Sequence, residues 1–121
     1  MKVFISGPMT GIEDFNRAKF NAMEKMLKEH GKSVFNPAWL AVDESWSRDD
    51  LMAVDIAVLA RCDAIVLLPG WENSEGARAE YAYAVSAGKR IYKGDVDDDG
   101  FSYMYPIKRT IELMKKNGEV G

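Results

Sequence analysis

The most informative pattern in this sequence is a carboxylate in the middle of an apolar helical stripe. Residues 47–61 predict a helix with Ser47 as its N-cap and Asp50 three residues later, close to a capping box. At 100° per residue, Asp55 lies at the centre of the apolar face of this helix. Its neighbours at helical spacing are Leu51, Met52, Val58, Leu59 and Cys62. An unpaired carboxylate buried there costs several kcal/mol or has a raised pKa, so this placement indicates chemistry rather than stability.

Glu80 repeats the pattern on the next predicted helix, which Ser74 caps and Gly88 ends. The residues that share its helical row are uncharged and mostly small: Gly76, Ala77, Tyr83, Ala84 and Ala87. The solvent face carries the polar set Glu75, Arg78, Ser86 and Lys89. We therefore expect Glu80 to point inward, with room for a ligand to approach it.

Two inward-facing acids on helices that flank one expected cleft favour a catalytic role. Perturbed carboxylates in a cleft are what general acid–base and nucleophilic chemistry require. A retaining glycosidic mechanism uses one carboxylate as the nucleophile and a nearby group to handle the proton. Either acid taken alone could equally be a paired structural residue.

The segment Gly7-Pro8-Met9-Thr10-Gly11 follows the first predicted strand and precedes a helix. Its two glycines let the backbone approach a ligand closely, although a plain turn would have the same composition. The segment matches neither the dinucleotide fingerprint nor the Walker A pattern. NAD chemistry and ATP hydrolysis therefore lose support.

Ser74 and Gly76 open a helix, and a helix N-terminus with a hydroxyl and a small residue can seat a phosphate. The alternative for Ser74 is an ordinary N-cap. Glu80 lies about 9 Å further along the same helix, which suits an anomeric carbon separated from a 5′-phosphate by a sugar. Trp71, in the loop just before, could stack on a base or simply pack within the loop.

Strands and helices alternate along the chain. We expect strands at Lys2–Ser6, Lys32–Asn36, Ala64–Leu68 and Arg90–Lys93, and helices over about 15–30, 47–61, 74–87 and 106–118. Asp14 is the expected N-cap of the first helix, residues 38–46 are expected to be irregular, and residues 94–105 to form a polar loop. This order predicts an α/β, three-layer fold with a four- to five-stranded parallel sheet. The loops after the first and third strands should then meet at the ligand site.

The composition predicts a single domain over residues 1–121, with 47% hydrophobic and 29% charged residues. A net charge of −3 argues against a nucleic-acid polymer or an anionic membrane as partner. With one cysteine, Cys62, and no apolar leader or membrane span, the expected location is cytoplasmic. His30 is the only histidine, so we expect no zinc site, and we expect no metal or other cofactor. Asp95–Gly100 reads as a solvated turn, since the twelfth position of a calcium loop would be Pro106.

These motifs together resemble the nucleoside 2-deoxyribosyltransferase superfamily. The residues concerned are the Gly7–Gly11 loop, the Asp55…Asp63-Ala64-Ile65-Val66 stretch and Ser74-x-Gly76-x-x-x-Glu80. The chain is most similar to the DUF4406 branch, and it also resembles the 2′-deoxynucleoside 5′-phosphate N-hydrolases. The resemblance implies a Rossmann/flavodoxin-like fold over most of residues 1–93.

The resemblance also implies roles for particular residues. Glu80 matches the nucleophile that attacks the sugar C1′, and Asp55 matches the aspartate that helps protonate the leaving base or positions the ligand. Ser74 matches the serine that contacts the 5′-phosphate in the hydrolases. The ligand contacts of the first loop match Gly7, Met9, Thr10 and Gly11. The family's sites are completed by a neighbouring subunit, which implies a homodimer or larger homo-oligomer with a contribution here from near residues 102–105.

The leading hypothesis is cleavage of the N-glycosidic bond of a 2′-deoxynucleoside or its 5′-monophosphate through a glycosyl-enzyme on Glu80. Hydrolysis is slightly favoured over transfer to a second base, because Ser74, Glu75 and Gly76 suggest a phosphate seat. One alternative is a module that binds or senses a nucleotide without turnover. Another is a purely structural or interaction protein.

Overall fold

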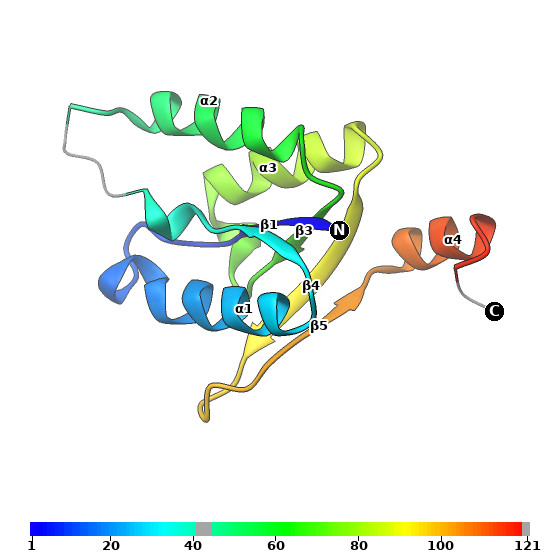
Figure 1. Ribbon diagram of the computed structural model, residues 1–121. Helices are drawn as coiled ribbons and strands as arrows, with labels where there is room; N and C mark the ends of the chain where they lie inside the picture. The colour runs from blue at the N-terminus through cyan, green and yellow to red at the C-terminus, as the bar shows by residue number, and fades with distance from the viewer. Residues whose placement is uncertain (41–44, 120–121) are drawn as a thin grey trace.

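The computed structural model describes residues 1–40 and 45–119, which form an α/β fold of three layers (Figure 1). Five strands form one sheet in the order β2-β1-β3-β4-β5. The strands are β1 (Lys2–Ser6), β2 (Ser33–Phe35), β3 (Ala64–Leu67), β4 (Arg90–Val96) and β5 (Ser102–Pro106). The first four are mutually parallel and β5 runs antiparallel to β4. The predicted fold class is confirmed.

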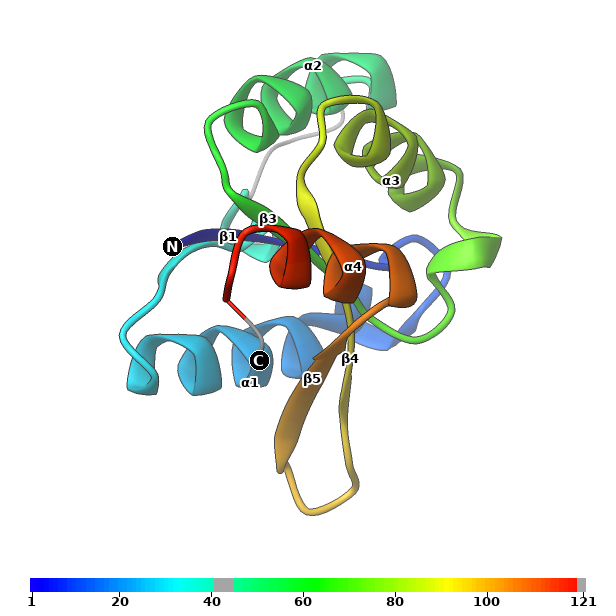
Figure 2. The ribbon, with the colours of Figure 1, turned by 90° about the vertical axis from the view of Figure 1, so that its right-hand side faces the viewer.

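The helices cover the two faces of the sheet unequally (Figures 1 and 2). Helix α1 (Arg17–Glu29) lies on one face, while α2 (Arg48–Leu59) and α3 (Glu75–Ser86) lie side by side on the other. Helix α4 (Lys108–Lys116) packs beside β4 and β5. Two buried clusters result, one between α1 and the sheet and one beneath α2 and α3. Each residue of β3 is buried because helices cover both of its faces.

Several predicted boundaries of the helices are confirmed. Ser47 caps α2 through a capping box, in which its hydroxyl accepts a hydrogen bond from the Asp50 N–H and the Asp50 carboxylate accepts one from the Ser47 N–H. Ser74 caps α3, because its Oγ accepts a hydrogen bond from the Ala77 N–H at 3.2 Å. Gly31 and Gly88 follow α1 and α3 with positive φ, as a left-handed helix stop requires.

The start of the first helix was predicted wrongly. Asp14 does not cap it, because Asp14, Phe15 and Asn16 all have positive φ. These residues belong to a short 3-10 segment, Glu13–Asn16, and α1 begins only at Arg17. Asn16 sets this turn, since its Nδ2 donates a hydrogen bond to the Pro8 carbonyl at 3.0 Å. This contact with the first loop accompanies the departure from the local helical pattern.

The predicted polar loop over residues 94–105 is a β-hairpin. β4 extends to Val96 and pairs with β5 in an antiparallel ladder, so the sheet is not wholly parallel. Gly94 lies within this strand, and a glycine is needed there because a Cβ atom would collide with Met23 and Val66. Pro106 ends β5 rather than starting the last helix, which begins at Lys108.

Two smaller expectations concern the remaining segments. A 3-10 turn at Pro37–Trp39 overlaps the start of the stretch 38–46 that was expected to be irregular, and residues 41–44 of that stretch lie outside the described residues. Within the described part of the chain, none of the helices combines the length and apolar character that crossing a membrane demands.

Candidate active site

The sheet topology places a ligand site at the ends of β1 and β3. The chain leaves β1 toward β2 on one side and leaves β3 toward β4 on the other, so the strand order reverses between β1 and β3. The loops that follow these two strands diverge there and open a crevice. A cavity of about 690 Å³ lies at this place, within the size range of small-molecule sites.

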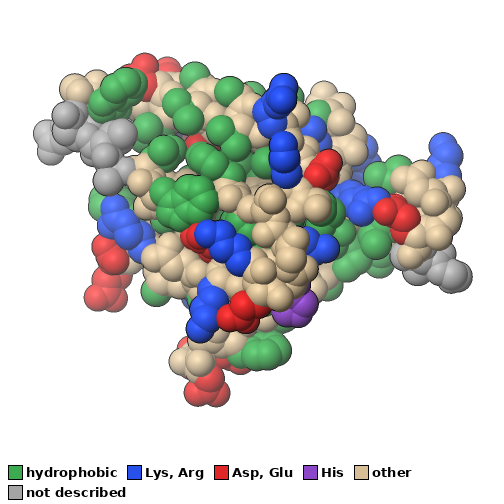
Figure 3. Space-filling model, viewed as in Figure 1, with side chains coloured by type: hydrophobic (Ala, Val, Ile, Leu, Met, Phe, Trp, Pro, Cys, Tyr) green, Lys and Arg blue, Asp and Glu red, His purple; other side chains and the backbone are tan. Residues whose placement is uncertain are grey.

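Three elements contribute the walls of this cavity. The first loop supplies Gly7, Pro8, Met9 and Thr10, and α2 supplies Arg48, Leu51, Met52 and Asp55. The start of α3 and the residue before its cap supply Asn73, Ser74, Glu75, Gly76, Ala77, Arg78 and Glu80, and Pro37 completes the lining. Hydrophobic side chains gather over α2 on this side of the molecule (Figure 3). The site thus combines an apolar wall with a few polar groups.

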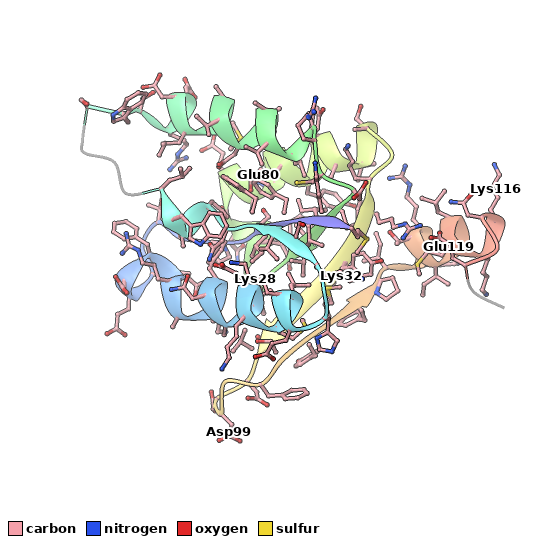
Figure 4. The ribbon with its side chains drawn as sticks, viewed as in Figure 1. Lys28, Lys32, Glu80, Asp99, Lys116 and Glu119 are labelled. Atoms are coloured by element: carbon pink, nitrogen blue, oxygen red, sulfur yellow. The ribbon has the colours of Figure 1, made fainter. Side chains whose placement is uncertain are left out.

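Glu80 points inward from α3 toward β1 (Figure 4), and its side chain is only 5% exposed. The Ser6 hydroxyl, at the end of β1, donates a hydrogen bond of 2.6 Å to Glu80 Oε1. A second hydrogen bond joins the carboxyl groups of Glu80 and Asp55. One carboxyl must therefore be protonated, because two carboxylates have no proton to share.

Burial governs the ionisation of this carboxyl pair. Removal from water, together with the neighbouring Asp55 carboxyl, raises the pKa of Glu80 to about 9, although the Ser6 hydrogen bond acts in the opposite direction. Burial also raises the pKa of Asp55, while its hydrogen bond with Glu80 lowers it. Both groups resist ionisation, and the raised pKa of Glu80 keeps a proton on the pair at neutral pH.

One oxygen of the Asp55 carboxyl is buried without a donor. No N–H or other protein donor among the described residues hydrogen-bonds to its Oδ1. Buried carboxylate oxygens are rarely left unpaired, because each lost hydrogen bond costs free energy. Asp55 is also one of the residues that line the cavity, so its carboxyl group lies between the Glu80 carboxyl and the ligand space.

The start of α3 offers a seat for an anion. The Ser74 Oγ accepts from the Ala77 N–H, which leaves the hydroxyl proton free to donate. Gly76 leaves the backbone open on the cavity side, where a Cβ atom would lie 3.4 Å from Met52 Cε. Two cations lie nearby, Arg48 with an ion pair to Glu75 and Arg78 with a hydrogen bond to a backbone carbonyl.

Most of the predicted site residues meet at this one cavity. Asp55, Glu80, Gly7, Met9, Thr10, Ser74 and Gly76 all line it. Gly11 and Trp71 do not. Gly11 is exposed, and nothing lies within 4 Å of a Cβ atom built there. Trp71 packs against Tyr81 with ring centroids 4.7 Å apart and borders a separate hollow of about 260 Å³.

Other polar residues have structural roles or lie elsewhere. Asp63 accepts a hydrogen bond from the Lys2 N–H at 2.8 Å and so ties the start of β3 to β1. The His30 ring contacts the Met26 carbonyl within α1. Asp97 closes the hairpin turn by accepting from two backbone N–H groups. Across residues 1–40 and 45–119, no three His, Cys, Asp or Glu side chains cluster as metal ligands would.

Sequence reasoning missed Ser6 and Arg48. Ser6 is fully buried, and its hydroxyl is the only described side chain, apart from Asp55, that bonds to Glu80. Its position as the last residue of a buried strand, directly before the Gly7 loop, is a signal that could have identified it. Arg48 has no comparable signal, because it occupies the first turn of α2 as many surface residues do.

Comparisons with known proteins agree with this architecture. A family model described as "Domain of unknown function (DUF4406)" matches residues 1–93. No curated protein matches the chain. A 2-desoxiribosyltransferase from Leishmania mexicana is 21% identical with a TM-score of 0.62, and the match covers 79% of this chain and 65% of that chain.

Two further solved structures share the fold. A 2-deoxyribosyltransferase from Bacillus psychrosaccharolyticus is 18% identical with a TM-score of 0.60, over 77% of this chain and 71% of that chain. The Clostridium botulinum CMP N-glycosidase BcmB is 19% identical with a TM-score of 0.51, over 100% and 85% of the two chains. At these identities the likeness establishes the fold.

Proposed function

From the premise that the chain belongs to the DUF4406 family and has the fold of the 2-deoxyribosyltransferases, we propose that it cleaves N-glycosidic bonds of nucleosides or nucleotides. The substrate class is a 2′-deoxynucleoside or its 5′-monophosphate. One observation carries the proposal: Glu80 and Asp55, two buried acids whose pKa values are raised, line one ligand-sized cavity whose rim is the N-terminus of α3.

Glu80 acts as the nucleophile in the first step. Its carboxylate oxygen forms a bond to the sugar C1′ while the C1′–N bond breaks, and the electron pair of that bond leaves with the base. Asp55 delivers its proton to the departing base, which keeps the charges balanced. The reactive form therefore has the proton on Asp55, and the Ser6 hydrogen bond favours it because the hydroxyl stabilises an ionised Glu80.

Water completes the reaction in the second step. Asp55, now a carboxylate, takes a proton from water while the oxygen attacks C1′ and the bond from C1′ to Glu80 breaks. Glu80 leaves as a carboxylate, and the pair again holds one proton. This double displacement retains the configuration at C1′. A second base in place of water would give transfer rather than hydrolysis.

The start of α3 favours a 5′-monophosphate as substrate. The Ser74 hydroxyl, the free N–H groups of the first turn and the Arg48 guanidinium can all bind phosphate oxygens. The separation of about 9 Å along the helix between Ser74 and Glu80 spans a deoxyribose. A terminal phosphate also makes water the simpler acceptor, since no second nucleoside site is needed. Hydrolysis is therefore preferred.

The test is release of free base from a panel of deoxynucleoside monophosphates, deoxynucleosides and ribonucleotides, measured by liquid chromatography. Wild type should release base from at least one deoxy substrate, and Glu80→Gln should lose at least a thousandfold in rate. Glu72→Gln, an exposed acid on the preceding turn, is the matched control and should retain activity. Base release by Glu80→Gln at the wild-type rate on every substrate would refute the mechanism.

The non-catalytic alternative makes a different prediction in the same experiment. A nucleotide-binding module would raise the melting temperature with a nucleotide while the ligand is recovered intact. Active sites shared between the subunits of a homo-oligomer remain a prediction. The test is to mix Glu80→Gln with a variant inactivated in the segment near residues 102–105 and to measure base release, which should recover if each site uses residues of both subunits.

A further inference from the structure

The outer edge of β5 has no strand partner among the described residues. β5 is the last strand in the sheet, and the β4–β5 hairpin extends past α1 in both ribbon views (Figures 1 and 2). Backbone hydrogen bonds at each end of the hairpin fix its pairing: Asp97 N to Phe101 O at 2.9 Å, and Ile107 N to Ile91 O at 3.1 Å.

This pairing determines which backbone groups face outward. Hydrogen-bonded and non-hydrogen-bonded pairs alternate in an antiparallel ladder, so Tyr103 and Tyr105 bond to β4. Ser102 and Met104 therefore direct their N–H and C=O groups away from the sheet. Both residues also line a hollow of about 670 Å³ between α1 and the hairpin.

The edge lacks the features that usually protect an exposed strand. Natural edge strands carry charges, bulges or prolines, whereas in β5 the one such feature is Pro106 at its end, and Ser102-Tyr103-Met104-Tyr105 carries no charge. Three aromatic side chains lie along one face: Phe101 is 67% exposed, Tyr103 44% and Tyr105 53%. Such an edge is suited to pairing with another strand.

We propose that two copies of this chain associate by antiparallel pairing of their β5 strands about a two-fold axis at Tyr103. Ser102 of each copy then lies opposite Met104 of the other, and the four outward backbone groups on each strand are satisfied. On the aromatic face, Tyr103 meets Tyr103 of the second copy, and Phe101 meets Tyr105. Aromatic cross-strand pairs are among the stabilising contacts of antiparallel sheets.

Charge complementarity supports a second copy as the occupant. In this register, residue 98 of one chain lies level with residue 108 of the other. The acidic turn formed by Asp97, Asp98 and Asp99 therefore approaches the exposed Lys108 at the start of α4 of the second copy. Two-fold symmetry repeats this contact, so one edge supplies both the acidic and the basic partner.

The pairing does not depend on the proposed chemistry. It also differs from the expectation that residues near 102–105 complete a neighbour's active site, because here the segment pairs with itself. The prediction is a single ten-stranded sheet that spans both copies.

The test is the concentration dependence of mass, measured by analytical ultracentrifugation. In the dimer, Tyr103→Lys places two ammonium groups next to each other at the two-fold axis. Within one chain, the new lysine lies opposite Asp95 of β4 and can form an ion pair with it, so the fold is kept. The dissociation constant of the dimer should rise at least tenfold. Val54→Lys, which charges the exposed outer face of α2, is the matched control and should leave the dimer intact.

A rescue experiment separates interface loss from misfolding. Tyr103→Glu alone should also weaken the dimer, and an equimolar mixture of Tyr103→Lys with Tyr103→Glu should restore a dimer at the wild-type concentration range. The proposal is overturned if wild type stays monomeric at every accessible concentration. It is also overturned if the mixture stays monomeric, or if Val54→Lys dissociates the dimer and Tyr103→Lys does not.

Discussion

The buried carboxyl of Glu80 predicts that the protein becomes less stable as the pH rises. Its pKa is about 9 in the folded protein against 4.5 for an unperturbed glutamate, because burial and the Asp55 carboxyl both disfavour the charged form. The unfolded chain therefore releases this proton at a lower pH than the folded chain does. The stabilisation is complete below about pH 4.5 and is lost progressively up to about pH 9.

The size of the effect follows from the proton difference. Where only the unfolded chain has lost the Glu80 proton, the free energy of unfolding falls by about 1.4 kcal/mol per pH unit. Between about pH 6 and pH 8 the loss is therefore about 3 kcal/mol, a large part of the stability of a small domain. Glu80→Gln stays neutral at every pH, so its stability should lack this decline.

The assay is denaturant unfolding of wild type and Glu80→Gln across this pH range, followed by tryptophan fluorescence. The difference between the two free energies of unfolding isolates Glu80 together with the Asp55 carboxyl that contacts it, since the remaining ionisable groups are common to both proteins. The free energy of unfolding of wild type should fall by about 3 kcal/mol relative to that of Glu80→Gln as the pH rises from about 6 to 8. Glu72→Gln is the control and should follow wild type. Parallel pH profiles for wild type and Glu80→Gln would show that Glu80 ionises normally, and the argument from burial would fail.

Three further predictions test the site and the fold. Ser6→Ala removes the hydrogen bond that favours ionised Glu80. A hydrogen bond to a charged acceptor is worth about 1.5–3 kcal/mol, so the acidic limb of the pH–rate profile should move up by about 1–2 pH units. An unchanged profile would remove Ser6 from the site. Gly94→Ala brings a methyl group to 2.7 Å from Met23 Cε, so thermal unfolding should show a loss of about 1–3 kcal/mol, whereas Gly100→Ala should perturb only the exposed turn through its positive φ. Ser74→Ala removes the cap of α3 and should lower the free energy of unfolding by about 1 kcal/mol in denaturant titrations. The same variant should bind a nucleoside monophosphate more weakly while its affinity for the nucleoside is unchanged. Equal losses of affinity for both ligands would argue against a phosphate seat.

Local sequence patterns were sufficient for much of the fold. The unbroken apolar run at Ala64–Leu67 predicted a strand covered on both faces, and all four residues are buried. The caps Ser47 and Ser74 fixed the starts of α2 and α3, because each satisfies backbone N–H groups within its own first turn. The patterns failed at Asp14–Asn16, where the backbone turns with positive φ and Asn16 bonds to the first loop, and in the hairpin around Gly94, where distant residues pack against the strand.

The same division holds for the candidate site. Helical periodicity alone predicted that Asp55 and Glu80 face inward, since the direction of a side chain on a helix depends only on its position along that helix. Periodicity could not measure how closely two helices approach, so the contact between the two carboxyl groups and the Ser6 hydrogen bond emerge only from the packing of α2 and α3 against β1. It also could not exclude Trp71 from the cavity, because the stacking of that ring on Tyr81 is a tertiary contact. The sequence therefore determined the residues that face the interior, and the tertiary structure decided which of them touch and what charge they can hold there.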